Sequence, residues 1–209
     1  MIRVLSTAFI VCLFASTAFA QDDGFKSMFN GKNLLGWHVS ENTEAVYIED
    51  GCIVTHGKRA HAFYVGENGS SDFSDFHFKC KVKTKANANS GIYFHTKYEA
   101  TGWPTVGYEC QVNNTHSDKK KTGGLYAIKD CFEAPAKDDV WFDYEVIVEG
   151  KHVVIKIDGK VITDYTEPED PDRPDNMKKR LIGSGTIALQ AHDPGSKVYF
   201  KDLMLKVSK

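Results

Sequence analysis

Helical periodicity and an excess of one charge are both scarce in this 209-residue sequence. Few stretches repeat apolar residues at the three-to-four-residue spacing of an amphipathic helix, which argues against a helical bundle. The formal net charge is −2 at pH 7. Domains that bind nucleic acids usually carry a basic patch and a high isoelectric point, so this charge balance argues against a nucleic-acid partner.

Cysteine is also sparse, and no C-x-x-C pair occurs. Such pairs supply ligands in many structural zinc sites, so the sequence gives no sign of one. The cysteines after the first twenty residues are Cys52, Cys80, Cys110 and Cys131. An even number in an exported chain permits two disulfides, with three possible connectivities. Cys80 and Cys110 lie on the apolar faces of their segments, so we favour small buried hydrophobic roles for these two.

A long hydrophobic run occurs only at the start, in "MIRVLSTAFIVCLFASTAFA". Arg3 is its single charge, and it ends in Ala18-Phe19-Ala20, the A-x-A pattern of signal-peptide cleavage sites. The run is short for a membrane anchor, and nothing later resembles a membrane-spanning segment. We therefore expect residues 1–20 to be a signal peptide. Residues 21–209 are then one secreted or periplasmic domain.

Short stretches of alternating apolar and polar residues take the place of helical repeats. Pairs such as Asp50-Gly51, Glu149-Gly150 and Asp158-Gly159 separate them, and these residues tolerate the positive φ of tight hairpin turns. Pro194-Gly195 suits the centre of a type II turn. The alternation predicts strands within 45–56, 75–84, 90–97, 107–113, 141–165 and 185–207.

The final region changes its apolar parity. Val198 and Phe200 share one parity, whereas Leu203 and Leu205 share the other, which predicts a β-bulge near Lys201-Asp202. Residues 166–180 hold three of the six prolines and several charges, and they predict a long surface loop. Many short strands with almost no helix predict an all-β fold, an antiparallel sandwich.

Unusual polar residues occupy the face opposite the apolar one on three predicted strands. Exposed strand faces are commonly rich in Lys and Thr, but these carry a carboxylate, amides, imidazoles and a phenol. The residues are Tyr93, His95, Glu109, Gln111, Asn113, Gln190 and His192, and Tyr126 follows a nearby turn. Such groups form directional hydrogen bonds, and the aromatic rings stack, as hydroxyl-rich sugars require. If the strands are neighbours, this face is a carbohydrate-binding groove.

A set of motifs spans nearly the whole of residues 21–209. In order they are FNGKNLLGW (29–37), NSGIYFH (89–95), GYECQV (107–112), TGGLY (122–126), WFDYEVIVEGKHVVIKIDGK (141–160) and ALQAHDPGSKVYFKDLMLK (188–206). Together they resemble the 3-keto-disaccharide hydrolase domain, a family of secreted bacterial proteins. The resemblance implies a jelly-roll β-sandwich of the concanavalin A-like type and a glycoside hydrolase that acts on 3-keto sugars.

The chain departs from this family at two places. Many relatives have Arg in place of His95, and many read Gln-Asp-His-Gly where this chain reads Gln190-Ala191-His192-Asp193. Glycosidases of the wider concanavalin-like class use two carboxylates two residues apart on one strand. The matching pair here is Glu109 and Gln111, of which only Glu109 ionises. This disfavours a retaining mechanism with two carboxylates about 5 Å apart.

A ketone at C3 acidifies the proton on C2, so one base could start an elimination that ends in net hydrolysis. Glu109 is the candidate base, and His95 and His192 are candidates for the acid or for stabilising the enolate. Gln111, Tyr93, Tyr126 and Gln190 are expected to bind the sugar. Asn89, Asn113 and Asp193 are further binding candidates. No cofactor is predicted, although a divalent metal held by His and Glu is compatible with the residues.

Two other functions remain open. The same groove could belong to a lectin-like module that binds glycans without cleaving them, because one fold can serve both functions. Alternatively, a scaffold or envelope protein could use the polar face to contact another protein. An exposed apolar patch would favour that third possibility.

Overall fold

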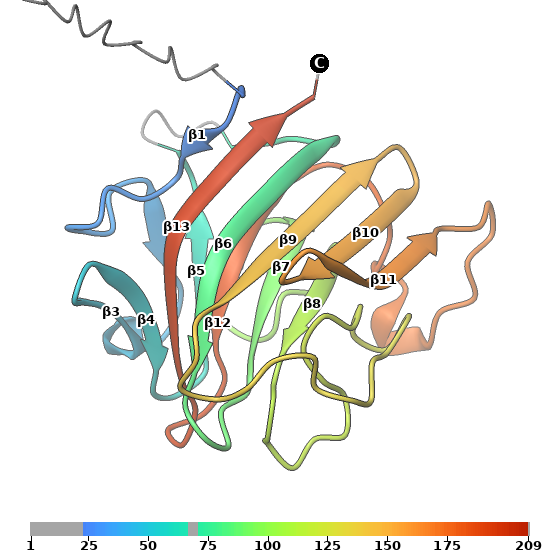
Figure 1. Cartoon of the computed structure of the whole chain (residues 1–209). Coiled ribbons are helices and arrows are strands. Elements are labelled where there is room, and N and C mark those ends of the chain that lie inside the picture. Colours follow the sequence, from blue (N-terminus) through green and yellow to red (C-terminus); the bar gives the residue numbers. More distant parts are fainter. Residues whose placement is uncertain (1–22, 67–70, 209) are drawn as a thin grey trace, which may run out of the picture.

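The computed structural model describes residues 23–66 and 71–208, and these form two antiparallel sheets packed face to face. Figure 1 shows the larger sheet in front and the smaller one behind it. Helical structure in the described residues consists of two short 3-10 turns, η1 (Thr43–Ala45) and η2 (Asp175–Met177). The all-β prediction is therefore confirmed. The expected signal peptide lies outside the described residues.

The strands fall into an eight-stranded and a five-stranded sheet. Across the larger sheet the order is β11 (Lys160–Thr166), β10 (His152–Ile157), β9 (Phe142–Glu149), β6 (Phe76–Thr84), β13 (Lys197–Val207), β4 (Cys52–His56) and β3 (Val46–Glu49), with β1 (Lys26–Ser27) also paired to β13. Across the smaller sheet it is β2 (Trp37–Val39), β5 (Ala60–Tyr64), β12 (Thr186–Ala191), β7 (Ser90–Thr96) and β8 (Tyr108–Val112).

The turn predictions are confirmed in detail. Asp50-Gly51 joins β3 to β4, and positive φ values of 50° and 72° fit these two residues. The register of β13 against β6 shifts between Lys201 and Met204, and Asp202 has φ 52°. This is the predicted bulge, and it turns Leu203 and Leu205 toward the core after the parity change.

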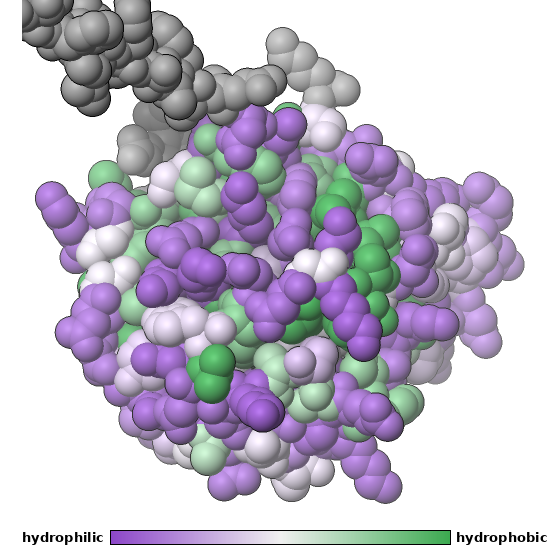
Figure 2. Space-filling model, in the orientation of Figure 1, coloured by the Kyte–Doolittle hydropathy of each residue, from purple (hydrophilic) through white to green (hydrophobic). Residues whose placement is uncertain are grey.

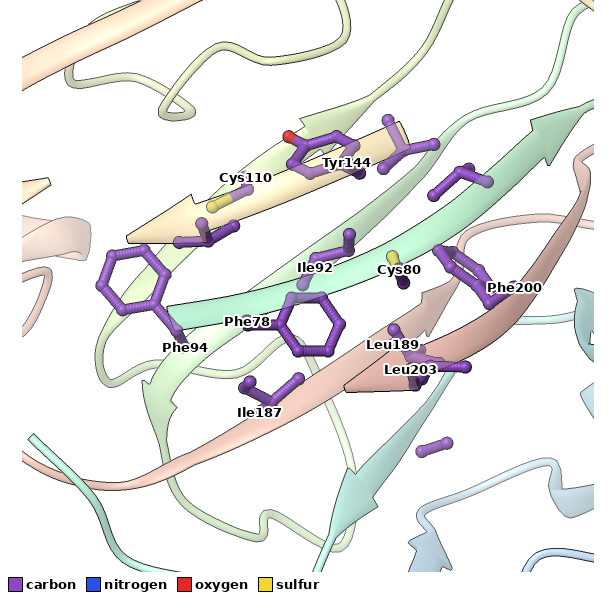
Figure 3. Packing of buried hydrophobic residues seen from close by; sticks show 14 of the residues in the cluster. Phe78, Cys80, Ile92, Phe94, Cys110, Tyr144, Ile187, Leu189, Phe200 and Leu203 are labelled. Carbon is purple, nitrogen blue, oxygen red and sulfur yellow. The ribbon is translucent and has the colours of Figure 1, made fainter. Parts of the chain in front are cut away.

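The core lies between the sheets, where apolar side chains from both layers interdigitate. Strand β6 alternates strictly between buried and half-buried residues, as its sequence predicts. Figure 3 shows Phe78 and Cys80 of β6 close to Ile92 and Phe94 of β7. Every second residue of these strands therefore serves the core, and the intervening residues face outward.

All four cysteines of the described ranges are free, which leaves the two permitted disulfides unformed. Cys80 and Cys110 are almost completely buried within the core, as expected for small hydrophobic residues. Burial raises the pKa of both thiols, so they stay protonated and unreactive at neutral pH.

The outward faces of the two sheets differ in character. That of the eight-stranded sheet, seen in Figure 2, is mainly hydrophilic and carries half-exposed lysines of β6 between the buried positions. Strands β7, β8 and β12 of the smaller sheet are buried at every position, on both faces. Side chains and loops therefore cover the outward face of the smaller sheet. Over the described residues, no helix is long and apolar enough to cross a membrane.

Candidate functional site

A cavity of about 390 Å³ opens on the outward face of the five-stranded sheet. This volume is within the range of small-molecule sites. Its floor comes from three strands and the residues next to them, and it consists of Asn89, Tyr93, Glu109, Gln111, Gln190 and His192. Tyr126 lines one side. Seven of the ten residues that the sequence singled out therefore share one cavity.

Adjacent strands explain this convergence. Strand β7 pairs with β12 on one side and with β8 on the other, so residues distant in sequence become neighbours. Tyr93 lies opposite Glu109 in the β7–β8 pair and opposite Ala188 in the β7–β12 pair. Because side chains alternate along a strand, the cavity face receives every second residue of each.

Glu109 is the acidic residue of the floor, and its side chain is almost completely buried. Gln190 Nε2 donates a hydrogen bond to Glu109 Oε1 over 3.0 Å. Burial raises the pKa of Glu109 because the charged form loses its hydration. The Arg180 guanidinium and hydrogen bonds from Tyr93 and Gln190 act in the opposite direction. A carboxylate in these surroundings is poorly hydrated and therefore a stronger base than one in water.

Gly91 makes room for this carboxylate. It lies on β7 beside Glu109, and a Cβ atom at this position would be only 2.6 Å from Glu109 Oε1 and 3.0 Å from Cγ. Its φ is not in the left-handed region, so the backbone alone does not require glycine. We conclude that the missing side chain at residue 91 provides the space that Glu109 occupies.

Two amide side chains on the floor have unused acceptors. Gln111 Nε2 donates to Asn89 Oδ1 over 3.1 Å, and Gln190 Nε2 donates to Tyr93 Oη over 2.9 Å. Oε1 of Gln111 and Oε1 of Gln190 are buried without a hydrogen-bond partner among the described residues. Buried polar atoms are normally paired, so these two oxygens point to a ligand that brings hydrogen-bond donors.

His192 lies at the end of β12, where Asp193 orients it. Its Nδ1 lies 2.8 Å from Asp193 Oδ2, so Nδ1 carries a hydrogen and donates it to the carboxylate. Its Nε2 lies 3.4 Å from the side-chain nitrogen of Asn89. Burial opposes ionisation of Asp193, but hydrogen bonds from Ser196, His192 and Gly195 hold its pKa below the ordinary value. Nε2 is thus the position at which His192 gains or releases a proton.

Three loops form the walls of the cavity. Trp103 and Thr105 come from the β7–β8 loop, Asp118 and Tyr126 from the segment after β8, and Met177 and Arg180 from the loop before β12. Sequence reasoning treated 166–180 as a surface loop and missed Arg180. Patterns of alternation describe strands, and nothing in them indicates where a loop folds back over a sheet.

A buried charged network holds the loop that carries Arg180. The Tyr108 hydroxyl donates a short hydrogen bond to Glu167, and Arg173 Nη2 donates to Tyr108 Oη over 2.9 Å. Arg173 Nε donates to the backbone oxygen of Arg180 over 3.0 Å. The guanidinium carbon of Arg180 lies 5.3 Å from the ring centre of Tyr93. The network therefore places a cation beside the Tyr93 ring and within electrostatic reach of Glu109.

His95 is a correction to the sequence analysis. Strict alternation along β7 would place it beside Tyr93, facing the cavity. However, the register against β12 passes from Tyr93↔Ala188 to Thr96↔Thr186, so β7 contains one extra residue, and His95 has φ 52°. This bulge moves His95 away from the cavity. Its Nε2 donates to the Ser74 oxygen over 2.7 Å, and its Nδ1 accepts from the Gly183 amide over 3.2 Å.

Both nitrogens of His95 are therefore occupied by structural bonds, and burial lowers the pKa of the ring. Asn113 and Asp193 also lie outside the cavity lining. Asn113 Nδ2 donates to the backbone oxygens of Asp118 and Lys120, which shapes the loop after β8. Asp193 acts on the cavity through His192. These three residues support the site, and we expect no direct sugar contact from them.

A metal site was left open by the sequence. Within the part of the chain that the structure describes, no three His, Cys, Asp or Glu side chains are grouped so that they could hold a metal ion. The groups that converge on the cavity are one carboxylate, one imidazole paired with Asp193, one guanidinium, and several amides and phenols. This set can accept a proton, donate one, and stabilise a developing negative charge.

Comparisons with known proteins agree with the fold and with sugar chemistry. A family model described as 3-keto-alpha-glucoside-1,2-lyase-like domain matches residues 24–206. A protein of Parabacteroides distasonis, provisionally named a glycosyl hydrolase, has a TM-score of 0.75 at 22% identity over 89% of this chain and 94% of its own. Comparison with curated proteins found no match.

Two sugar-binding proteins share the architecture. The carbohydrate-binding module CBM66 of Bacillus subtilis has a TM-score of 0.59 at 14% identity, over 82% of this chain and 95% of its own. The VIP36 exoplasmic domain, solved with Ca2+ and Man3GlcNAc, has a TM-score of 0.58 at 9% identity, over 90% and 91%. At these identities the likeness concerns the fold, and it confirms the expected lectin-like sandwich.

Proposed function

Because the chain belongs to the 3-keto-alpha-glucoside-1,2-lyase-like family, we propose that it cleaves the glycosidic bond of 3-keto-glycosides by proton abstraction at C2. The observation that carries this proposal is Glu109, an ionisable base buried on the floor of a sugar-sized cavity. Its neighbours compensate its charge without blocking its approach from the cavity. The chemistry requires such a base, because the C3 ketone makes the C2 proton acidic.

The reaction has two bond-breaking steps. Glu109 takes the C2 proton, and the electron pair of that bond forms an enolate across C2 and C3. When the C3 carbonyl re-forms, a double bond appears between C1 and C2, and the C1–oxygen bond breaks toward the leaving group. Addition of water, with hydroxide at C1 and a proton at C2, completes a net hydrolysis. The lyase reaction ends before this addition.

Arg180 and His192 are suited to the two charges that develop. The enolate oxygen needs a donor or a cation, and Arg180 supplies a guanidinium at the cavity wall. The leaving oxygen needs a proton, and Nε2 of His192 is the position from which one can be released. Asp193 stabilises the protonated form of that imidazole through the bond to Nδ1. Arg180 replaces His95 as the candidate for enolate stabilisation.

The free oxygens of Gln111 and Gln190 orient the sugar. Each accepts a hydrogen bond, and sugar hydroxyl groups donate one, whereas a ketone cannot. These two residues therefore fit hydroxyls beside the ketone, and they leave the carbonyl oxygen for donors such as Arg180. Tyr126 and Asn89 complete the contacts on the β8 side of the cavity.

Export belongs to the same proposal. The A-x-A pattern at Ala18-Phe19-Ala20 supports cleavage after Ala20, and an exported enzyme would meet oxidised disaccharides outside the cytoplasm. The measurement is the N-terminal sequence of the protein recovered after expression with its own first twenty residues. A start at Gln21 supports export, whereas a retained Met1 in fully folded protein argues against it.

The test of the catalytic proposal uses 3-keto-trehalose and 3-keto-lactose with the wild-type protein and Glu109→Gln. The wild-type protein should release monosaccharide or its unsaturated product, and the folded variant should lose at least about 100-fold in rate, the usual contribution of a general base. The isosteric amide keeps the size of residue 109. Full activity in the folded variant would remove Glu109 from the mechanism.

A binding module is the second candidate, because the sandwich resembles sugar-binding proteins and the cavity offers unpaired acceptors. The same experiment separates the two functions. A binding module would hold several sugars without releasing any product, and Glu109→Gln would alter affinity alone.

A further inference from the structure

The cavity has an aromatic end that the reaction at C1 and C2 does not use. Trp103 lines this end from the β7–β8 loop, and its side chain is exposed to 41%. Its ring centre lies 5.2 Å from that of His192, the residue that faces the leaving oxygen. The group on the far side of the glycosidic bond would therefore lie beside Trp103.

Behind Trp103 lies a second histidine without a structural explanation. His61 of β5 is completely buried, and neither ring nitrogen has a hydrogen-bond partner within 23–66 and 71–208. It pairs in register with Gln190, so the two side chains are neighbours on the cavity face. The ring centres of His61 and Trp103 are 5.6 Å apart in an edge-on contact, so the indole covers the imidazole.

Burial lowers the pKa of His61 to about 3, so the ring is neutral at pH 7. A neutral imidazole carries one donor and one acceptor, which matches a sugar hydroxyl. Leaving both unused in a buried site costs stability, and phenylalanine would fill the same space without that cost. A hydrogen-bonding group at this position is therefore better explained by a ligand than by packing.

The Trp103 segment can uncover His61 by a small movement. The loop is tied down at the neighbouring residue, where the Gly102 amide donates to Glu41 Oε1 over 2.8 Å, and Glu41 also accepts from Arg59. The indole itself is partly exposed, and rotation about its side-chain bonds opens the space in front of the imidazole. No change in the sheet is needed.

We propose that Trp103 and His61 form a second sugar subsite, in which the leaving sugar of a disaccharide stacks on the indole and donates to or accepts from the imidazole. This subsite rests on the proposed function, and it makes disaccharides better ligands than glycosides with a small leaving group. Aromatic residues supply stacking area, and the buried imidazole supplies direction.

The experiment measures binding without turnover. Trehalose and methyl α-glucoside lack the C3 ketone, so the proposed reaction cannot occur, and calorimetric titration reports affinity alone. The variants are Trp103→Ala and His61→Phe. Trp141→Ala, on the other sheet, and His38→Phe, whose ring stacks on Tyr98 at 4.4 Å, are matched controls. Circular dichroism confirms that each variant is folded.

Both site variants should bind trehalose about tenfold more weakly, and methyl α-glucoside with unchanged affinity, because one stacking contact corresponds to roughly a factor of ten. The controls should match the wild-type protein. Equal losses for both sugars, no loss for either, or no binding of trehalose to the wild-type protein overturns the subsite. Selective loss with a wild-type protein that leaves 3-keto-trehalose intact supports the subsite and overturns the catalytic proposal.

Discussion

Replacement of Gly91 by alanine tests whether the space beside Glu109 is essential. The new Cβ would lie 2.6 Å from Glu109 Oε1, and ordinary contact begins near 3.4 Å, so the carboxylate must move by about 0.8 Å. Such a movement would disturb the 3.0 Å hydrogen bond from Gln190. A misplacement near 1 Å can cost about 100-fold in rate, and overpacking destabilises by about 1–3 kcal/mol.

The assay compares the release of product from 3-keto-trehalose with thermal unfolding for Gly91→Ala and Gly183→Ala. A methyl group at residue 183 would meet no atom within 4 Å, and Gly183 lacks a left-handed φ, so it is the matched control. We expect a large loss of rate for residue 91 and little change for residue 183. A folded Gly91→Ala protein with wild-type rate would refute the claim that Glu109 needs this space.

Three further predictions concern charge and thiols. Arg180→Leu removes the cation that lowers the pKa of Glu109, so the acid limb of the pH–rate profile should move to higher pH; an unmoved limb would contradict this. The folded pKa of Glu109 lies above its ordinary 4.5, so wild-type stability should fall as pH rises from about 4.5 through that raised value. Glu109→Gln lacks this loss, and denaturation at several pH values should show its advantage growing toward neutrality. Iodoacetamide should label half-exposed Cys131 in the native protein but spare Cys80 and Cys110, and labelling of all three at equal rates would contradict the buried assignment.

The strands and their faces were predictable because each follows from a local pattern. Alternation placed Phe78 and Cys80 inside, and the parity change at Lys201-Asp202 located a bulge. The same reasoning failed at His95, where a second bulge lies in a strand without a change of apolar parity to reveal it. Phe94 remains in the core on one side of the bulge, and His95 follows it there.

The floor of the site was predictable and its walls were not. Glu109, Gln111 and Gln190 stand out because costly polar groups replace the residues usual on an exposed strand face. Arg180 and Trp103 lie in loops, where position depends on contacts such as Arg173 to the Arg180 backbone and Gly102 to Glu41. Those contacts depend on how the loops fold over the sheet, and no spacing rule connects them.

The central claim is that Glu109 removes the proton at C2 of a 3-keto-glycoside. Proton NMR of the products formed from 3-keto-trehalose in D2O tests it most directly. The wild-type protein should yield an oxidised sugar with deuterium, or no hydrogen, at C2, and Glu109→Gln should neither exchange that proton nor release the sugar. Products that keep the original hydrogen at C2, formed at equal rates by both proteins, would contradict the account.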